Sequence, residues 1–148
     1  MTNIDSEILN ISLLIKVVIA TICGAIIGYD REVKHKVAGL RTNILICVGC
    51  AIFTAFAFDI TEVMKATDPT RIIGQIITGI GFLGAGVIVK QEDKVVGVTT
   101  AAFIWVISGI GILAGMGLVI IPIVLTIGLL IVTRFFEKVE RYIRNDRN

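Results

Sequence analysis

A short charged segment between two apolar stretches holds the residues best suited to bind a ligand. Residues 28–43 read G-Y-D-R-E-V-K-H-K-V-A-G-L-R-T-N. The carboxylates of Asp30 and Glu32 supply oxygen ligands for a hard cation such as Mg²⁺, which binds one or two carboxylates and keeps several waters. The guanidinium groups of Arg31 and Arg41 are equally able to neutralise them. The segment therefore predicts a magnesium site at Asp30 and Glu32 or a paired network of charges, with a plain solvated loop as the simplest alternative.

Lys16 is a cation inside an apolar stretch. It follows Ile8, where the first predicted span begins, by eight residues, which places it about 12 Å into that span. Charges within a span are costly and usually have a partner or a function. Asp5, Glu7 and Asp59 are the candidate partners. The alternative is a shifted span boundary that lets the amine reach the outer interface.

Uncharged polar residues also lie in the apolar segments. Gln75, about one turn after Arg71, is a candidate for an interhelical hydrogen bond or a pore-lining amide. Thr99 and Thr100 are expected to cap the helix that begins there. Trp105 lies deeper than an interfacial belt, so we expect it to pack between helices. For each of them, helix packing is the simpler role.

Patterns typical of enzymes are weak. Cys47 and Cys50 match C-x-x-C, but they lie in mid-span without a second pair, which favours packing over zinc or redox chemistry. Residues 79–84 match G-x-G-x-x-G, yet no strand precedes them and no acidic residue follows about 20 residues later, so a nucleotide site is not expected. No nucleophile has an adjacent base. The sequence predicts a non-enzymatic protein without a cofactor, magnesium being the open alternative.

The composition is that of a membrane protein. The 148 residues have a mean hydropathy of +0.92, with 55% hydrophobic and 18% charged residues. A soluble domain of this size cannot bury so much apolar surface, so the chain is predicted to be an all-α polytopic membrane bundle with one domain, residues 1–148. The lipid bilayer is then its first partner. A net charge of +2 is too small to indicate nucleic acid.

Five membrane spans are predicted, at approximately residues 8–28, 42–58, 72–89, 98–114 and 118–135. The last two share one long apolar run, which we divide at the Gly-Met-Gly sequence of residues 115–117. We expect the third span at the centre of the bundle, because its small residues occupy several helical faces and allow close approach of neighbours. These residues include Gly74, Gly79, Gly81, Gly84 and Gly86.

The cations of the connections predict the orientation. Eleven Lys and Arg residues fall in the first loop, the third loop and the C-terminal tail, against two in the second loop. By the positive-inside rule, the N-terminus is expected outside and the C-terminus in the cytoplasm. The tail, with aromatic and aliphatic residues at spacings of three and four, is expected to extend the fifth helix or to lie at the interface.

Three blocks of this sequence resemble the MgtC/SapB family of bacterial membrane proteins. They are residues 28–43, residues 71–88 and residues 97–111, in that order. Asp30 stands where the family usually has Glu, and Val98 where it usually has Leu. The resemblance marks a set of motif residues: Arg31, Arg41, Thr42, Asn43, Arg71, Gln75, Gly79, Gly81, Gly84, Gly86, Thr99, Thr100 and Trp105.

The resemblance implies a five-span, multi-pass protein of the bacterial plasma (inner) membrane. Several members support survival when magnesium is scarce or inside host phagocytes, and one is implicated in restraining the proton-translocating ATP synthase. Some members carry a soluble domain after the membrane part. This chain ends about a dozen residues past the last predicted span, so we expect no such domain.

Two functions compete on this basis. In the first, the protein is a membrane regulator that forms a homodimer or higher homo-oligomer, or binds a partner such as the ATP synthase. Its contacts would use small-residue faces such as Gly24-x-x-x-Gly28 and Gly111-x-x-x-Gly115. In the second, it is a small oligomeric transporter or channel for magnesium or another ion, with Asp30, Glu32, Gln75 and Lys16 along the path. Five short helices leave little room for a pathway, so we favour the regulator.

Overall fold

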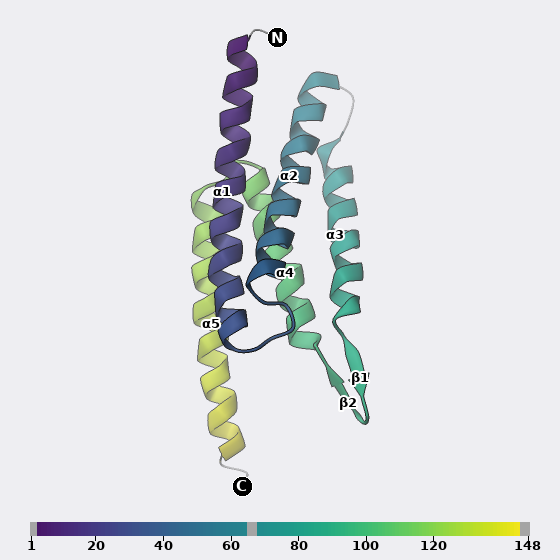
Figure 1. Cartoon of the computed structure of the whole chain (residues 1–148), viewed down its shortest axis with the longest axis vertical. Coiled ribbons are helices and arrows are strands. Elements are labelled where there is room, and N and C mark those ends of the chain that lie inside the picture. Colours follow the sequence, from purple (N-terminus) through teal and green to yellow (C-terminus); the bar gives the residue numbers. More distant parts are fainter. Residues whose placement is uncertain (1–2, 65–67, 146–148) are drawn as a thin grey trace.

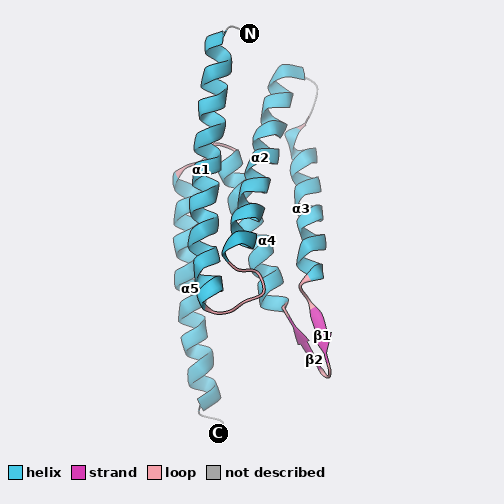
Figure 2. Cartoon of the chain, in the orientation of Figure 1, coloured by secondary structure: helices cyan, strands magenta, loops and turns pink. Residues whose placement is uncertain are grey.

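The computed structural model describes residues 3–64 and 68–145, with side chains for residues 11–61 and 68–144. Within these ranges the protein has five helices and one short β-hairpin (Figures 1 and 2). The helices are α1 (Asn3–Val33), α2 (Leu40–Met64), α3 (Pro69–Gly86), α4 (Val98–Gly115) and α5 (Ile120–Asn145). The strands β1 (Val89–Gln91) and β2 (Lys94–Val96) pair antiparallel between α3 and α4.

Four of these helices, α1, α2, α4 and α5, are long and apolar enough to cross a membrane. The all-helical, multi-pass prediction is confirmed to that extent. The prediction of a third span at residues 72–89 is not: α3 ends at Gly86, and Val89 already belongs to β1. Arg71, Gln75 and five glycines lower the mean hydropathy of α3, and the β-branched residues after Gly86 favour a strand.

The core of the bundle lies where α1, α2 and α4 meet. Gly24 and Gly28 of α1 lie so close to α2 that a Cβ on either one would come within 2.8 Å of an α2 Cα atom. Gly111 and Gly115 of α4 face the α2 backbone in the same way. Backbones approach this closely only at small residues. These two faces, expected to contact a second copy or a partner, are therefore occupied within the chain.

Helix α3 lies at the edge of the bundle, against α2 and α4 (Figure 1). Only Ile80 and Gly84 of this helix are buried. The expected central position of this segment is therefore wrong. The reason is that the core uses the glycines of α1 and α4 for close approach, whereas a Cβ at four α3 glycines would meet nothing within 4 Å. The four are Gly74, Gly79, Gly81 and Gly86.

Local chemistry sets the ends of the helices. Asp68 caps α3, because its Oδ1 accepts from the backbone N of Thr70 at 2.9 Å and Pro69 follows at the first position. The hydrogen bonds from Thr70 hold the pKa of the Asp68 carboxyl below its usual value. Gly97 precedes α4 with a φ of 93°, and a Cβ there would collide with the carbonyl of Val87. Only glycine fits this turn from hairpin to helix.

The two ends of the bundle are distinct. The loop between α1 and α2, the hairpin and the C-terminal end of α5 lie at one end, and the N-terminus lies at the other (Figure 1). The connections assigned to the cationic side therefore do share an end; Lys65 and Arg147 lie outside the described residues. The tail continues α5 as a helix to Asn145, as one of the two expectations had it. Which end faces the cytoplasm stays a prediction.

Candidate functional site

A network of ion pairs fastens the end of α1 to α5. The Asp30 carboxylate, 4% exposed, has Lys34 Nζ 2.8 Å from Oδ2 and Arg134 Nη2 2.9 Å from Oδ1. Lys34 Nζ also lies 2.7 Å from Glu137 Oε2. Partial burial alone would lower the pKa of Lys34, but its hydrogen bonds to Asp30 and Glu137 outweigh this and raise it. The cation at Lys34 is thus stabilised at neutral pH.

Arg31 follows Asp30 in the chain and is buried on another side of the same helical turn. Its side chain is 1% exposed and its Nη2 donates to Thr100 Oγ1 at 3.1 Å. The guanidinium carbon lies 4.1 Å from the centre of the Phe103 ring. Arg31 Nε has no hydrogen-bond partner, and no described carboxylate lies within salt-bridge distance of Arg31. A buried, nearly unpaired cation is unusual, because an uncompensated buried charge is costly.

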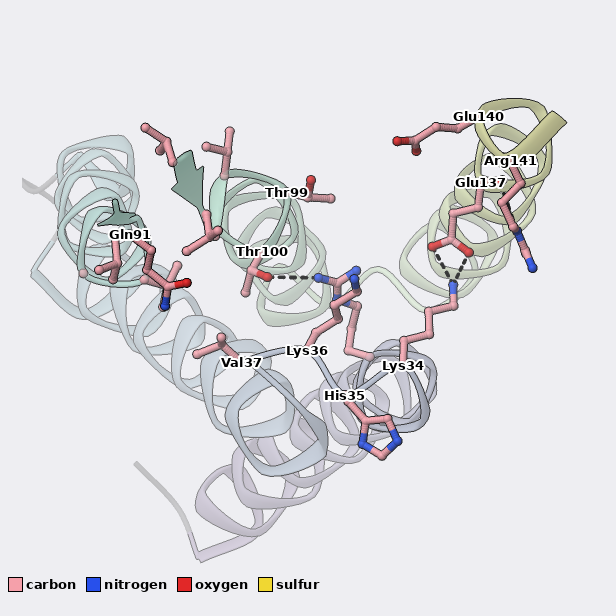
Figure 3. A pocket seen from close by; sticks show the side chains of 18 of the residues that line it. Lys34, His35, Lys36, Val37, Gln91, Thr99, Thr100, Glu137, Glu140 and Arg141 are labelled. Atoms are coloured by element: carbon pink, nitrogen blue, oxygen red, sulfur yellow. Dashed lines mark hydrogen bonds and ion pairs between the residues drawn. The ribbon is translucent and has the colours of Figure 1, made fainter. Parts of the chain in front are cut away.

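Both features border a cavity of about 880 Å³ at the cationic end of the bundle (Figure 3). The α1–α2 loop, the hairpin, the first turn of α4 and the last turns of α5 form its walls. Its charged side chains are Arg31, Lys34, Lys36, Arg141 and Arg144 against Glu137 and Glu140, with His35 beside them. Cations outnumber carboxylates, so the cavity is suited to an anion rather than to a metal ion.

The loop itself is organised by two polar side chains. Buried Asn43 donates from Nδ2 to the carbonyl oxygens of Ala38 at 3.0 Å and Gly39 at 2.7 Å. Glu32 Oε2 accepts from the backbone N of Leu40 at 2.9 Å, which ties the loop to the start of α2. In contrast, Arg41 and Thr42 are exposed on the first turn of α2. The 28–43 segment is thus a structured connection in which Asn43 acts on the backbone.

Asp30 and Glu32 do not act together on a metal in this arrangement. The Asp30 oxygens face Lys34 and Arg134, and Glu32 faces the backbone of the loop. In the part of the chain that the structure describes, no group of three or more His, Cys, Asp or Glu side chains gathers in a geometry able to hold a metal. Of the three possibilities that the sequence left open, which were a magnesium site, a paired network and a solvated loop, the geometry matches the paired network. Magnesium binding there stays a prediction without support from these contacts.

Several residues of the predicted spans lie elsewhere than expected. Thr99 and Thr100 do not cap α4, since Gly97 is the N-cap and no side chain caps this end. Trp105 is 58% exposed on the surface of α4 and does not pack between helices within this chain. Arg71 and Gln75 are exposed on α3, and Gln75 makes no interhelical hydrogen bond to a described residue. Neighbouring helices leave these two side chains free because α3 lies at the edge of the bundle.

Lys16 lies next to the reversal between α4 and α5. Its Cε would be 3.6 Å from a Cβ at Gly117, and the two residues border a small cavity of about 260 Å³. No ion pair joins Lys16 to a described carboxylate, while the side chains of Asp5 and Glu7 lie outside the described residues. Lys16 thus lies beside a chain reversal, and the shifted span boundary that would let its amine reach the interface stays a prediction.

The contributions of α5 to this site were not predicted from the sequence. Arg134 and Glu137 are three residues apart, so they lie on one face of α5 and meet Asp30 and Lys34, four residues apart on α1. The similar spacing of opposite charges on the two segments is compatible with an ion-paired contact between them. The contact could not be assigned from the sequence, because the spacing does not specify which helices are neighbours.

Comparison with known proteins identifies the family. Residues 17–142 match the sequence profile of the MgtC family. The chain belongs to the MgtC family. Protein MgtC of Brucella abortus is 45% identical over 100 residues, which are 68% of this chain and 41% of that protein. The putative magnesium transporter YhiD of Escherichia coli K12 is 38% identical over 138 residues, 89% of this chain and 64% of that protein.

A third MgtC-family relative is also longer than this chain. Protein MgtC of Salmonella typhimurium is 40% identical over 114 residues, 76% of this chain and 47% of that protein. The chain spans 41% to 64% of the length of these three relatives. No solved structure matches the chain. Of these three relatives, the E. coli protein has a name that refers to magnesium transport. Family membership and the apolar helices make this chain a multi-pass membrane protein.

Proposed function

We propose that this protein is a non-enzymatic, non-transporting regulator in the bacterial inner membrane that supports adaptation to magnesium limitation. The observation that carries this proposal is the ion-pair network at the C-terminal end of α1, which engages the Asp30 carboxylate. Asp30, the buried carboxylate in the described part of the bundle, is already neutralised by Lys34 and Arg134. A divalent cation would have to displace two charged partners to use it.

The centre of the bundle also argues against a path for ions. Gly24, Gly28, Gly111 and Gly115 bring α1 and α4 into backbone contact with α2. Buried hydroxyls such as those of Ser108 and Thr126 donate to carbonyl oxygens of their own helices. A dehydrating Mg²⁺ needs several free oxygen ligands. The described core therefore suits a rigid scaffold better than a conduit.

In this proposal the regulatory contacts are made by the open face of α3. A Cβ at Gly74, Gly79, Gly81 or Gly86 would meet no atom within 4 Å, and Phe82 on the same helix is 80% exposed. Small residues permit close helix approach in a membrane. A second copy of the chain, giving a homodimer or higher homo-oligomer, or a membrane protein such as the ATP synthase would occupy this face.

Magnesium transport is the second candidate, favoured by the name of the E. coli relative. The deciding measurement is Mg²⁺ flux in proteoliposomes of purified protein whose helicity is checked by circular dichroism. We expect no saturable flux above that of protein-free vesicles. Saturable flux that is lost in Asp30→Asn, with Glu32→Gln as a second variant, would overturn the regulator and make the α1–α2 connection part of a permeation path.

A further inference from the structure

The cavity at the cationic end has a buried cation at its base. Arg31 is 1% exposed, and of its five N–H donors one is placed in a hydrogen bond, to Thr100. Nε is buried without a partner. The dashed line at Thr100 in Figure 3 marks the hydrogen bond that Thr100 accepts from Arg31. Since Asp30 and Glu137 are engaged by other cations, the charge of Arg31 is available for a ligand.

The guanidinium group is also held in position before any ligand binds. The Phe103 ring lies under it at 4.1 Å and Thr100 Oγ1 accepts from one end. Stacking on an aromatic ring and a fixed hydrogen bond orient the planar donor fork. An oriented guanidinium group binds the oxygens of an anion at little entropic cost, and Arg is the usual residue for phosphate recognition.

The start of α4 adds a second set of donors to the same cavity. Gly97 to Thr100 line its wall, and no side chain caps the helix at Gly97. The first N–H groups of a helix have no intrahelical acceptor, and the helix dipole favours negative charge there. Because only glycine fits the φ of 93° at this position, the chain cannot supply its own capping acceptor. An anion can satisfy these N–H groups.

The rim of the cavity has an excess of positive charge. Lys36, Arg141 and Arg144 line it opposite the hairpin, while Glu140 is the one lining carboxylate that is in no ion pair among the described residues. Glu140 is directed into the cavity and opposes an anion there (Figure 3), but the lining as a whole has five Lys and Arg side chains against two carboxylates. Donors on three different elements surround the space, which suits the non-coplanar oxygens of a tetrahedral anion better than the two coplanar oxygens of a carboxylate.

We propose that this cavity binds a phosphate group, with Arg31, Thr99, Thr100 and the first turn of α4 as its inner ligands and Lys36, Arg141 and Arg144 at its rim. The phosphate belongs either to a small phosphate-bearing molecule from the aqueous phase or to the headgroup of an anionic phospholipid. The site is separate from the α3 face, so it stands whether or not the protein is a regulator.

Inorganic phosphate is the first probe. The protein is purified in a maltoside detergent, which carries no phosphate, and its unfolding temperature is followed during titration with phosphate or with chloride at equal ionic strength. We expect saturable stabilisation by phosphate beyond that by chloride. A second arm adds phosphatidylglycerol to the micelles, with a neutral glycolipid as the comparison. Saturation by inorganic phosphate supports the aqueous source, and stabilisation by phosphatidylglycerol alone supports the lipid source.

Matched variants locate the binding. Arg31→Gln is expected to weaken phosphate binding about tenfold or more, because a charged hydrogen bond is worth about 1.5–3 kcal/mol. Lys36→Gln, at the rim, should weaken it by a smaller factor without affecting the fold, and it serves if Arg31→Gln does not fold. Arg41→Gln removes an exposed cation that does not line the cavity and should leave binding unchanged. The proposal would be overturned if phosphate acts no differently from chloride and phosphatidylglycerol no differently from the glycolipid. Equal losses of binding in Lys36→Gln and Arg41→Gln would also overturn it.

Discussion

The Asp30 carboxylate of α1 is in contact with the Arg134 guanidinium of α5, although 104 residues separate them in the chain. Arg134 donates through Nε at 3.0 Å and approaches with Nη2 at 2.9 Å, so the contact involves two nitrogens. At the end of the bundle where α1 finishes, α5 extends beyond α4 (Figure 1). The Asp30–Arg134 pair therefore fixes the part of α5 that borders the cavity at the cationic end of the bundle.

Asp30→Asn should lower the free energy of unfolding by about 1–3 kcal/mol, because it leaves Arg134 without a carboxylate and Lys34 with Glu137 alone. Arg134→Gln should cost less, below about 1 kcal/mol, since that side chain is 61% exposed. Unfolding in mixed micelles with rising SDS gives both values. Additivity of the two losses in the double variant would show that the contact does not stabilise the protein.

Gly111→Ala should destabilise the bundle by about 1–3 kcal/mol, because the new methyl group would collide with the backbone of α2 at Cys47. Gly109→Ala is the matched control on the same helix, where a Cβ meets nothing within 4 Å. It should be neutral or stabilising by up to about 1 kcal/mol through helix propensity. The same unfolding assay compares them, and equal effects would contradict the close α2–α4 contact.

Trp105, the one tryptophan of the sequence, should report the surface of α4 directly. Since 58% of it is exposed within a helix able to span a membrane, brominated acyl chains should quench its fluorescence, and aqueous iodide should not. Proteoliposomes with each quencher provide the measurement. Quenching by iodide instead would place this face of α4 in water, and protection from both would indicate that another chain covers it.

Acidic pH should weaken the start of α3 through Asp68. Its pKa is lowered in the folded chain by hydrogen bonds from Thr70, so its stabilising contribution is present above the unfolded value of 3.8 and is lost as pH falls through the lower folded value. Asp68→Asn keeps an N-cap acceptor that does not titrate. The difference in unfolding free energy between the two proteins should therefore change as the pH falls through 3.8 and below. A constant difference would contradict the folded contact.

Gly81→Leu should disrupt self-association without unfolding the chain. A side chain at this position meets no atom within 4 Å of its Cβ in the chain itself, but would hold a neighbouring helix away from α3. Gly128→Leu on α5 is the control, since its Cβ is also unobstructed there. Cross-linking in bilayers measures the oligomer. Loss of the oligomer in both variants or in neither would exclude the α3 face as the contact.

The sequence predicted most of the helical architecture because hydropathy and length report burial in lipid directly. The division of the last apolar run near Gly115 is confirmed, with α4 ending there and α5 starting at Ile120. The hairpin was missed because each strand has only three residues: Val89 was assigned to the end of the third span, and Lys94–Val96 to the polar connection after it. The place of α3 was missed because glycine allows close approach without requiring it.

The candidate site could be predicted only in its local part. Arg31, Asn43 and Thr100 were singled out from motifs, and the structure buries all three. Their roles depend on contacts that sequence spacing does not reveal: Arg31 meets Thr100 across 69 residues, and Lys34 meets Glu137 across 103. Such pairs follow from which helices are neighbours, and that information lies in the packing of small residues.

Cys23, Cys47 and Cys50 are all buried in the core where α1 meets α2, and all three are free thiols. A maleimide reagent can reach them only when these helices separate. The rate of alkylation of the unmodified protein therefore times the opening of the bundle, and a ligand or partner that closes it would slow the labelling. The three native thiols therefore report the rate at which the core opens, without an added label.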